Sequence, residues 1–279
     1  MKKIALISDD ICSLPPSIIR KFEIEIVKTK MSFPEWEKWQ ERNIYQVIKE
    51  TKKIPKTAAP SAGDFLKAYQ KFKNIAEKIL VITISSRLSG VFNSAFFARE
   101  LFEDPAKIFL FDSELAVAGE GLLVLRAGEL IKEGKEIEEI LKELEILKKK
   151  IKFLAYLKTL FFAKKSGRIS FWQKFSFDIL KILGVTPYLG IKEGEIKFSG
   201  FNLWTYNPLN AIFNQIKREA KKGKIRVGIN YTDNIGFALK LKEKIEKELK
   251  AEISFFSSVP PIVGAITGPG TLILACHNL

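Results

Sequence analysis

Residues 79–90 read ILVITISSRLSG, an apolar run that ends in serines and a glycine before a helical pattern begins. Such a run is typical of a buried strand that leads into the N-terminus of a helix. Helix N-termini carry unpaired backbone N–H groups and the positive end of the helix dipole, so they attract carboxylates and phosphates. Ser85, Ser86 and Ser89 would add side-chain donors, which predicts an anion-binding loop. The alternative is that these serines only cap the helix, a role that suits serine.

The length and the cysteine content limit the class of protein. The chain has 279 residues, which predicts two domains, and its two cysteines, Cys12 and Cys276, lie at opposite ends without metal-ligand spacing. Reduced thiols in a cytoplasmic protein are therefore expected rather than a disulfide framework or a zinc site. The apolar N-terminal run is too short for a signal-peptide core, and no stretch is long enough to span a membrane. We expect a soluble cytoplasmic protein without a metal.

The formal net charge is +14, which raises the question of a polyanionic partner. The lysines are spread through glutamate-rich helical segments, as in 132–152, and no basic run is interleaved with aromatic residues. This pattern indicates a solvated surface, so no nucleic-acid partner is predicted. The Lys- and Glu-rich composition is also typical of thermophilic proteins.

Strand and helix patterns alternate in the first half of the chain. Strands are predicted at 4–8, 23–30, 79–84 and 108–111, and helices at 16–22, 60–72, 91–102, 119–132 and 136–149. Apolar strands between helices predict a parallel sheet covered on both faces, an α/β/α domain whose ligands bind at the carboxyl ends of the strands. In the second half, residues 191–198 alternate about Glu193-Gly194, which predicts a β-hairpin. We expect domains at 1–155 (α/β) and 156–279, the latter α+β with a largely antiparallel sheet.

Six sequence blocks follow one another in the order and spacing found in the DegV family. They are 56–65 (KTAAPSAGDF), 84–95 (ISSRLSGVFNSA), 111–113 (FDS), 119–121 (GEG), 165–169 (KSGRI) and 267–270 (TGPG). Because the blocks extend over nearly the whole chain, the sequence resembles this family as a whole rather than in one motif.

The resemblance implies a two-domain carrier that encloses one long-chain fatty acid and presents it to a separate fatty-acid kinase. It implies no catalytic residue and no cofactor. It places the carboxylate between the domains, near Thr57 and Ser86, and the acyl chain in a tunnel lined mainly by the C-terminal domain. The aromatic and apolar tunnel candidates, for each of which core packing is the alternative, are Phe153, Leu160, Phe161, Phe162, Phe171, Phe175 and Phe177.

A carboxylate that leaves water needs hydroxyl and amide donors in place of its hydration. The predicted head-group site comprises Thr57, Ser85, Ser86, Arg87, Ser89, Gly90, Ile266, Thr267 and Gly268. Transient contact with a membrane is compatible with this function, because the lipid must be loaded from somewhere.

Four positions depart from the family pattern. Ile266 stands where a histidine is usual, Arg87 where a glycine is usual, and Asp10 where a serine is common. Residues 197–202 contain no counterpart of an arginine that the family is thought to need for work with the kinase. We expect Arg87 to compensate the charge of the ligand, since a guanidinium can pair with a carboxylate through two hydrogen bonds. A simple surface arginine is the alternative.

Two other classes of function remain open. The first is a hydrolase or transferase for acyl or phosphoryl substrates with Ser86 as nucleophile, but it requires a base, and the chain's one histidine is His277. The second is a nucleic-acid or anionic-membrane binder driven by net charge. Asp9 and Asp10 end the first predicted strand and would suit a magnesium site, although paired acids at such a position also cap the next segment.

Overall fold

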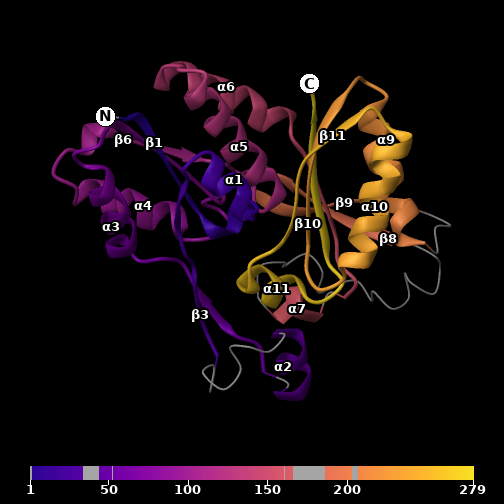
Figure 1. Ribbon diagram of the computed structural model, residues 1–279. Coiled ribbons are helices and arrows are strands. Elements are labelled where there is room, and N and C mark those ends of the chain that lie inside the picture. Colours follow the sequence, from indigo (N-terminus) through magenta and orange to yellow (C-terminus); the bar gives the residue numbers. More distant parts are fainter. Residues whose placement is uncertain (1, 34–43, 52, 160, 166–185, 203–206) are drawn as a thin grey trace. The chain divides into compact units, whose positions relative to one another are not determined.

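The chain folds into two compact units, each made of several segments. The computed structural model describes residues 2–33, 44–51, 53–159, 161–165, 186–202 and 207–279 (Figure 1). Unit 1 comprises Met1–Lys30, Thr57–Ile151 and Glu193–Glu195, and unit 2 comprises Met31–Lys56, Lys152–Lys192 and Ile196–Leu279.

Unit 1 is built on a four-stranded sheet with the order β2-β1-β5-β6, in which all neighbouring strands are parallel. The strands are β1 (Lys2–Asp9), β2 (Glu25–Val27), β5 (Ala76–Thr83) and β6 (Ile108–Asp112). Ile79 to Ile82 of β5 are completely buried, because this strand lies inside the sheet and helices pack on it. The predicted parallel sheet is therefore confirmed.

Five helices accompany this sheet in the described part of unit 1. They are α1 (Pro16–Lys21), α3 (Ala62–Phe72), α4 (Val91–Glu100), α5 (Ala118–Lys132) and α6 (Ile137–Lys150). Helix α3 packs against α4, and α5 packs against α6 (Figure 1). The apolar stripe of α6 is buried at Ile137, Ile140, Leu144 and Leu147, so it contributes to the core as expected from its spacing.

One predicted strand of unit 1 was wrong in its extent. The pattern over 23–30 predicts a single strand, but β2 ends at Val27 and a separate strand, β3 (Lys30–Ser32), follows. The backbone N–H of Thr29 donates to Oδ1 of Asp10 at 3.0 Å, which takes the chain out of register with β1. Strand β3 instead pairs with β4 (Lys56–Ala58), where the chain leaves unit 1 and returns to it.

Unit 2 contains a six-stranded mixed sheet with the order β11-β10-β12-β7-β8-β9. The strands are β7 (Lys152–Tyr156), β8 (Thr186–Lys192), β9 (Glu195–Asn202), β10 (Ile225–Tyr231), β11 (Ala251–Ser258) and β12 (Leu272–Asn278). Strands β10 and β11 are parallel, whereas β12 is antiparallel to both β10 and β7, and β7 is antiparallel to β8. This confirms the predicted α+β half with a largely antiparallel sheet.

The helices of unit 2 fall into two groups. Helices α9 (Pro208–Ala220) and α10 (Ile235–Glu248) pack against each other and on the sheet, where Ile225, Val227, Leu241 and Ile245 are fully buried (Figure 1). Helices α2 (Ile44–Thr51), α7 (Phe161–Lys165) and α11 (Pro261–Thr267) form the second group, in which α11 contacts both α2 and α7.

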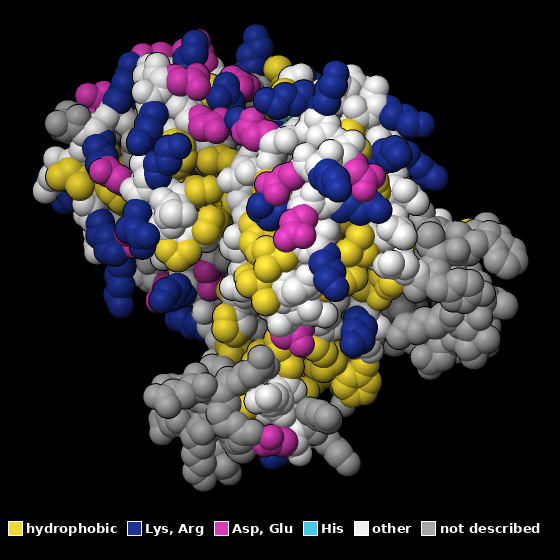
Figure 2. All heavy atoms as spheres, turned by 45° about the vertical axis from the view of Figure 1, so that its right-hand side comes forward, with side chains coloured by type: hydrophobic (Ala, Val, Ile, Leu, Met, Phe, Trp, Pro, Cys, Tyr) yellow, Lys and Arg dark blue, Asp and Glu magenta, His cyan; other side chains and the backbone are white. Residues whose placement is uncertain are grey.

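Charged side chains are mixed on the surface. On the face that Figure 2 shows, Lys and Arg are interspersed with Asp and Glu rather than gathered in one basic patch. Some lysines are paired with glutamates of the same helix, as in Lys242 with Glu246 at 2.8 Å. This arrangement agrees with the interpretation of the positive charge as a solvated surface. Among the helices that the structure describes, none is both long and apolar enough to cross a bilayer.

Candidate functional site

The predicted anion-binding loop, residues 85–90, lies at the carboxyl end of the parallel sheet of unit 1. It follows β5 and precedes α4, and the neighbouring strand β6 ends beside it at Asp112. The loop closes as a tight turn, since the backbone N–H groups of Leu88 and Ser89 both donate to the carbonyl oxygen of Ser85, at 3.0 and 3.2 Å. The site thus has the position that a parallel sheet gives to ligands.

Ser85 holds this loop in place. Its side chain is completely buried, and its hydroxyl donates to the carbonyl oxygen of Gly194 at 2.8 Å while accepting from the N–H of Arg87 at 3.3 Å. Its own backbone N–H donates to the carbonyl oxygen of Leu115 at 2.8 Å. The Ser85 hydroxyl is therefore engaged within unit 1.

Ser86 and Ser89 differ from Ser85 because their hydroxyls have no hydrogen-bond partner within the described part of the chain. Ser86 is exposed and Ser89 is half-buried. Helix α4 begins after Gly90, its N-cap, which provides no side-chain cap. The capping alternative for the serines is thus wrong for α4, and two hydroxyls remain available beside a helix N-terminus.

Asp112 contacts the loop, although it is not among the predicted site residues. The backbone N–H of Ser86 lies 3.2 and 3.3 Å from its two carboxylate oxygens. The Asp112 carboxylate therefore already accepts the Ser86 backbone N–H, a donor that an anionic ligand would otherwise use. The signal was present in the sequence, because Asp112 ends a strand next to β5 and parallel strands end at the same edge of a sheet.

Arg87 is exposed, and its Nη1 lies 3.4 Å from Oε1 of Glu195. Glu195 follows the hairpin turn, where Glu193 and Gly194 have φ angles of 54° and 76°. These values fit the predicted Glu-Gly turn. A Cβ added to Gly194 would lie 2.7 Å from the hydroxyl oxygen of Ser85, so only glycine lets the turn approach the loop this closely.

Thr57 lies in β4 and is half-buried. Its segment runs beside the loop, since a Cβ added at Gly90 would lie 3.8 Å from Cβ of Ala59. Unit 1 therefore brings together two of the predicted blocks, 56–65 and 84–95. Ser61 and Asp64 of the first block form a capping box at the start of α3, which gives those two residues a structural role.

The remaining predicted site residues, Ile266, Thr267 and Gly268, lie in unit 2 at the end of α11. Ile266 is half-buried, and the hydroxyl of Thr267 donates to the carbonyl oxygen of Val263 at 2.9 Å. Gly268 has a φ of 84°, and a Cβ there would lie 2.5 Å from Cδ2 of Phe162. The Thr267 hydroxyl and the Gly268 backbone therefore serve the C-terminal end of α11.

The residues after Gly268 are also held by internal bonds. The Thr271 hydroxyl lies 3.0 Å from the carbonyl oxygens of both Thr267 and Gly268. The backbone N–H of Gly270 donates to Oδ1 of Asp233 at 2.6 Å. The hydroxyl of Thr271 and the N–H of Gly270 are therefore bonded to protein atoms of unit 2.

Three of the predicted tunnel residues are described. Phe153 is half-buried in β7, and Phe161 and Phe162 of α7 pack edge to face with ring centroids 5.5 Å apart. Phe161 is 52 % exposed, which is unusual for a core phenylalanine. Leu160, Phe171, Phe175 and Phe177 lie outside the described residues, as do block 165–169 after its first residue and residues 203–206.

The candidate nucleophile and the candidate metal ligands can also be placed. Unit 1, which contains Ser86, has no histidine, and His277 lies in β12 of unit 2 with Nδ1 2.9 Å from its neighbour's carbonyl oxygen. Asp9 accepts the N–H of Ile11 at 3.0 Å and caps the 3₁₀ turn Asp10–Cys12, as the capping alternative expects. No group of three or more His, Cys, Asp or Glu that could hold a metal occurs among the described residues.

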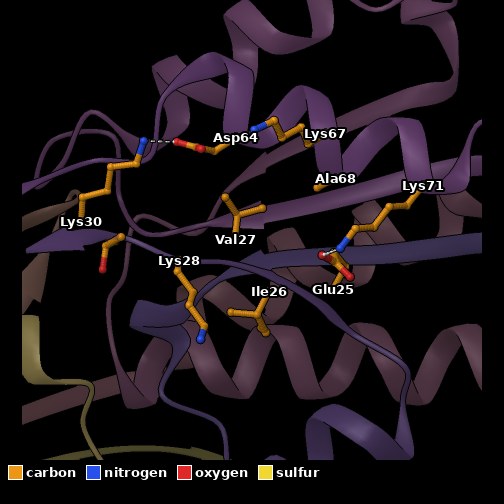
Figure 3. Close-up of a pocket in the computed structure, with 10 residues that line it drawn as sticks. Glu25, Ile26, Val27, Lys28, Lys30, Asp64, Lys67, Ala68 and Lys71 are labelled. Carbon is orange, nitrogen blue, oxygen red and sulfur yellow. Dashed lines mark hydrogen bonds and ion pairs between the residues drawn. The ribbon is translucent and has the colours of Figure 1, made fainter. Parts of the chain in front are cut away.

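A separate hollow of about 340 Å³ lies between residues 25–30 and α3 (Figure 3). Lys30 pairs with Asp64 and Lys71 with Glu25, whereas Lys28 and Lys67 have no acidic partner among the described residues. Figure 3 shows the Lys28 side chain pointing away from the other labelled lysines. The two unpaired amines therefore do not converge on one anion.

Comparisons with known proteins cover nearly the whole chain. A family model described as "Uncharacterised protein, DegV family" matches residues 3–277. A Thermotoga maritima protein named fatty acid-binding protein is 29% identical over 285 residues, with 97% of this chain and 96% of that protein covered. A Thermus thermophilus structure, described as fatty acid binding of a DegV family protein, has a TM-score of 0.87 at 27% identity and covers 99% of this chain and 100% of its own. A DegV lipid-binding protein of Thermotoga maritima has a TM-score of 0.82 at 27% identity, with 99% of both chains covered.

Proposed function

The chain belongs to the DegV family, and from this premise we propose that it binds one long-chain fatty acid and carries it without catalysing a reaction. The observation that carries the proposal is the loop after β5 at the carboxyl end of a parallel sheet, where the hydroxyls of Ser86 and Ser89 have no hydrogen-bond partner among the residues that the structure describes. Relatives that match nearly the whole chain are named for fatty-acid or lipid binding.

The head group is proposed to meet donors of three kinds. The hydroxyls of Thr57, Ser86 and Ser89 replace water around the carboxylate. Gly90 leaves the start of α4 without a side-chain cap, so the helix dipole favours the negative charge there. Arg87 supplies a full positive charge, which it shares with Glu195 in the absence of ligand.

Two predicted residues act on the shape of the site rather than on the ligand. Ser85 ties the loop to the hairpin turn at Gly194, and Gly268 ends α11 under the ring of Phe162. Ile266 and Thr267 belong to the same helix end. Because Ile266 stands where the family usually has a histidine, stabilisation of the carboxylate's charge depends more strongly on donors from unit 1.

The acyl chain provides most of the binding free energy in this proposal. Burial of hydrocarbon contributes about 0.8 kcal/mol per methylene, so a chain of about sixteen carbons contributes roughly 12 kcal/mol before the costs of binding. The described tunnel candidates are Phe153, Phe161 and Phe162, and the exposed ring of Phe161 is an apolar surface that a lipid could cover.

A carrier function fits the site better than covalent catalysis. Serine is a weak nucleophile unless a neighbouring base takes its proton. Among the described residues, the hydrogen-bond partner of Ser86 is the Asp112 carboxylate, which accepts the backbone N–H rather than the hydroxyl. A serine-reactive phosphonate probe should leave the protein unlabelled, whereas stoichiometric labelling of Ser86 would favour the hydrolase or transferase alternative.

We extend the proposal to two partners. The first is a fatty-acid kinase that receives the bound lipid, although residues 197–202 lack the expected arginine. The second is transient contact with a membrane during loading. Co-purification with a fatty-acid kinase, and vesicle binding that depends on the lipid load of the protein, are the respective measurements.

The test is mass spectrometry of the purified protein, first under native conditions and then after organic extraction. We expect one long-chain fatty acid for each chain. The Ser86→Ala variant should retain the fatty acid about tenfold less tightly, since a hydrogen bond to a charged group contributes about 1.5 to 3 kcal/mol. Ser17→Ala, which removes an exposed hydroxyl on α1, serves as the matched control. A protein that stays empty when it is offered fatty acids would refute the proposal.

A further inference from the structure

A pair of buried carboxyl groups lies behind the head-group loop. Asp9, the last residue of β1, and Glu120, in the first turn of α5, are both 0% exposed, and Ser8 and Cys12 are buried with them. Glu120 belongs to the 119–121 block, for which the proposed function gives no role. Two carboxyl groups in a protein core must be neutralised, paired or protonated.

The two carboxyl groups have different hydrogen-bond partners. The Oδ1 of Asp9 accepts the N–H of Ile11 at 3.0 Å, and its Oδ2 accepts the N–H of Ile84 at 2.9 Å. For Glu120, the hydroxyl of Ser8 lies 3.4 Å from Oε1, and Oε2 has no hydrogen-bond partner in the described part of the chain. Backbone donors therefore stabilise a negative charge on Asp9, while Glu120 is the better place for a proton.

The charged groups around the pair do not neutralise it. The titratable groups that act on Glu120 are the acids Asp9 and Asp10, and Glu120 in turn acts on the Cys12 thiol. The basic groups on α5 and on the elements packed against it are exposed or pair elsewhere. In the part of the chain that the structure describes, the ion pairs of these elements and of the α5–α6 connection are Lys2 with Glu23, Lys3 with Glu136, Lys78 with Glu138, Arg126 with Glu129, Glu133 and Glu143, Lys135 with Glu139, and Lys148 with Glu114 and Glu145.

Burial also changes the acidity of both groups. It raises the pKa of Asp9 to about 7, and it raises the pKa of Glu120 well above the usual range of a glutamate, with a further increase from the nearby charge of Asp9. The folded protein thus binds more protons at these two groups than the unfolded chain does. Their contribution to stability is largest at acidic pH and decreases as the pH rises through neutrality.

Asp9 connects this pair to the head-group loop. Ile84, whose N–H it accepts, is the residue immediately before Ser85, and the N–H of Ser85 donates to the carbonyl oxygen of Leu115 on the chain that leads into α5. Val117 on the same chain has a φ of 50°, a conformation that costs energy for a β-branched residue, so surrounding packing must hold this segment.

We propose that Asp9 is a positioning residue for the loop 85–90 and that the Asp9–Glu120 pair holds a proton, on Glu120, that keeps this loop in place. Loss of the proton leaves two adjacent buried anions, which repel each other and loosen the bonds from Asp9 to the loop. The consequence for ligand binding rests on the proposed function: fatty-acid affinity would fall as the pair loses its proton.

The first test needs no ligand. Hydrogen exchange of the full-length protein is followed by mass spectrometry for the peptide that spans residues 79–90. In Asp9→Asn only one acceptor oxygen remains, so the NH₂ group faces one of the two backbone N–H groups that the carboxylate now accepts, those of Ile11 and Ile84, and exchange should rise about tenfold or more. Asp10→Asn is the matched control, because Asp10 accepts the N–H of Thr29 instead. Equal exchange of the 79–90 peptide in the two variants would overturn the positioning role.

The second test is a pH profile. In Glu120→Gln, an amide of nearly the same shape replaces the proton with a fixed N–H donor. The decrease in stability against urea between about pH 6 and pH 9 should become markedly flatter than in the parent, and the exposed-site control Glu114→Gln should follow the parent. If the stability of Glu120→Gln depends on pH in the same way as that of the parent, the proposed proton on Glu120 is refuted, even if Asp9→Asn does not fold.

Fatty-acid affinity measured over the same pH range separates this inference from the proposed function. A flatter affinity profile in Glu120→Gln supports both. A loop that responds in the exchange experiment while no fatty acid binds at any pH supports the positioning role and refutes the proposed function.

Discussion

Two loops of this protein, 85–90 in unit 1 and 267–271 in unit 2, contain hydroxyl residues and glycine, and both are predicted to meet the same ligand. Their hydrogen bonds differ. In the first loop the hydroxyls of Ser86 and Ser89 have no partner among the described residues, and α4 begins without a side-chain cap. In the second, the hydroxyls of Thr267 and Thr271 bond to nearby carbonyl oxygens.

Similar residue types in two motifs therefore serve different purposes. A hydroxyl that already donates within its own turn gives little to a ligand, because the exchange of one hydrogen bond for another contributes little net free energy. A hydroxyl without a protein partner breaks no internal hydrogen bond when it donates to a carboxylate; it exchanges water for a charged acceptor, which forms a stronger hydrogen bond. The comparison therefore predicts that substitutions in the second loop act mainly on stability, and those in the first mainly on binding.

The largest effect is expected for Gly268→Ala. Gly268 has φ 84° and ψ 174°, a region that is nearly restricted to glycine, and a Cβ would lie 2.5 Å from the Phe162 ring. Backbone strain and overpacking together should lower the free energy of unfolding by about 2 to 5 kcal/mol, measured by urea denaturation. Gly63→Ala, in α3 where the nearest atom is 3.7 Å away, should be neutral or stabilising. Equal stability of the two variants would contradict the structural role of Gly268.

An intermediate effect is expected for Ser85→Ala, which tests whether the first loop has its own structural residue. The change removes a buried donor to the Gly194 carbonyl oxygen and should lower the free energy of unfolding by about 1 to 3 kcal/mol. Ser86→Ala should change stability by less than about 0.5 kcal/mol, because that hydroxyl is exposed. Thermal denaturation of both variants measures this difference. Equal stability of the two variants would contradict a structural role specific to Ser85.

A smaller effect on stability than that of Ser85→Ala is expected for Arg87→Ala. Its contact with Glu195 is exposed and 3.4 Å long, and such pairs contribute less than about 1 kcal/mol after screening by solvent. Fatty-acid affinity should nevertheless fall, and the loss should decrease at high salt. Isothermal titration at two salt concentrations, with Arg20→Ala on α1 as the control, measures both. Unchanged affinity would show that Arg87 does not bind the head group and that neutral donors alone hold the carboxylate.

Much of the fold could be predicted because its signals are local. The buried strand 79–82 and the stripe of α6 follow from the periodicity of apolar residues, and the hairpin at Glu193-Gly194 follows from turn chemistry. The strand predicted over 23–30 failed because Asp10, distant in sequence, binds the Thr29 N–H and ends the pairing. The division into domains at residue 155 stays a prediction. The structure itself contains two compact units, each made of several segments of the chain.

The candidate site was predictable as a set of positions but not as a set of roles. The apolar run before the serines is enough to place residues 85–90 at the carboxyl end of a buried strand. Only the tertiary structure separates Ser85, which is fully buried and bonded to Gly194, from Ser86, which is exposed. The reason is that burial and hydrogen-bond partners come from segments far apart in the chain.

Neighbouring residues alone were therefore enough to predict the parallel sheet, the largely antiparallel sheet, the family resemblance and the location of the serine loop, because periodicity, turns and motifs are local patterns. The tertiary structure decided what surrounds that loop: the Asp112 carboxylate at the Ser86 amide, the Gly194 turn at Ser85, and the buried Asp9 and Glu120 behind Ile84. Each of these contacts joins residues more than 20 positions apart, and so depends on how the strands and helices pack rather than on any local pattern.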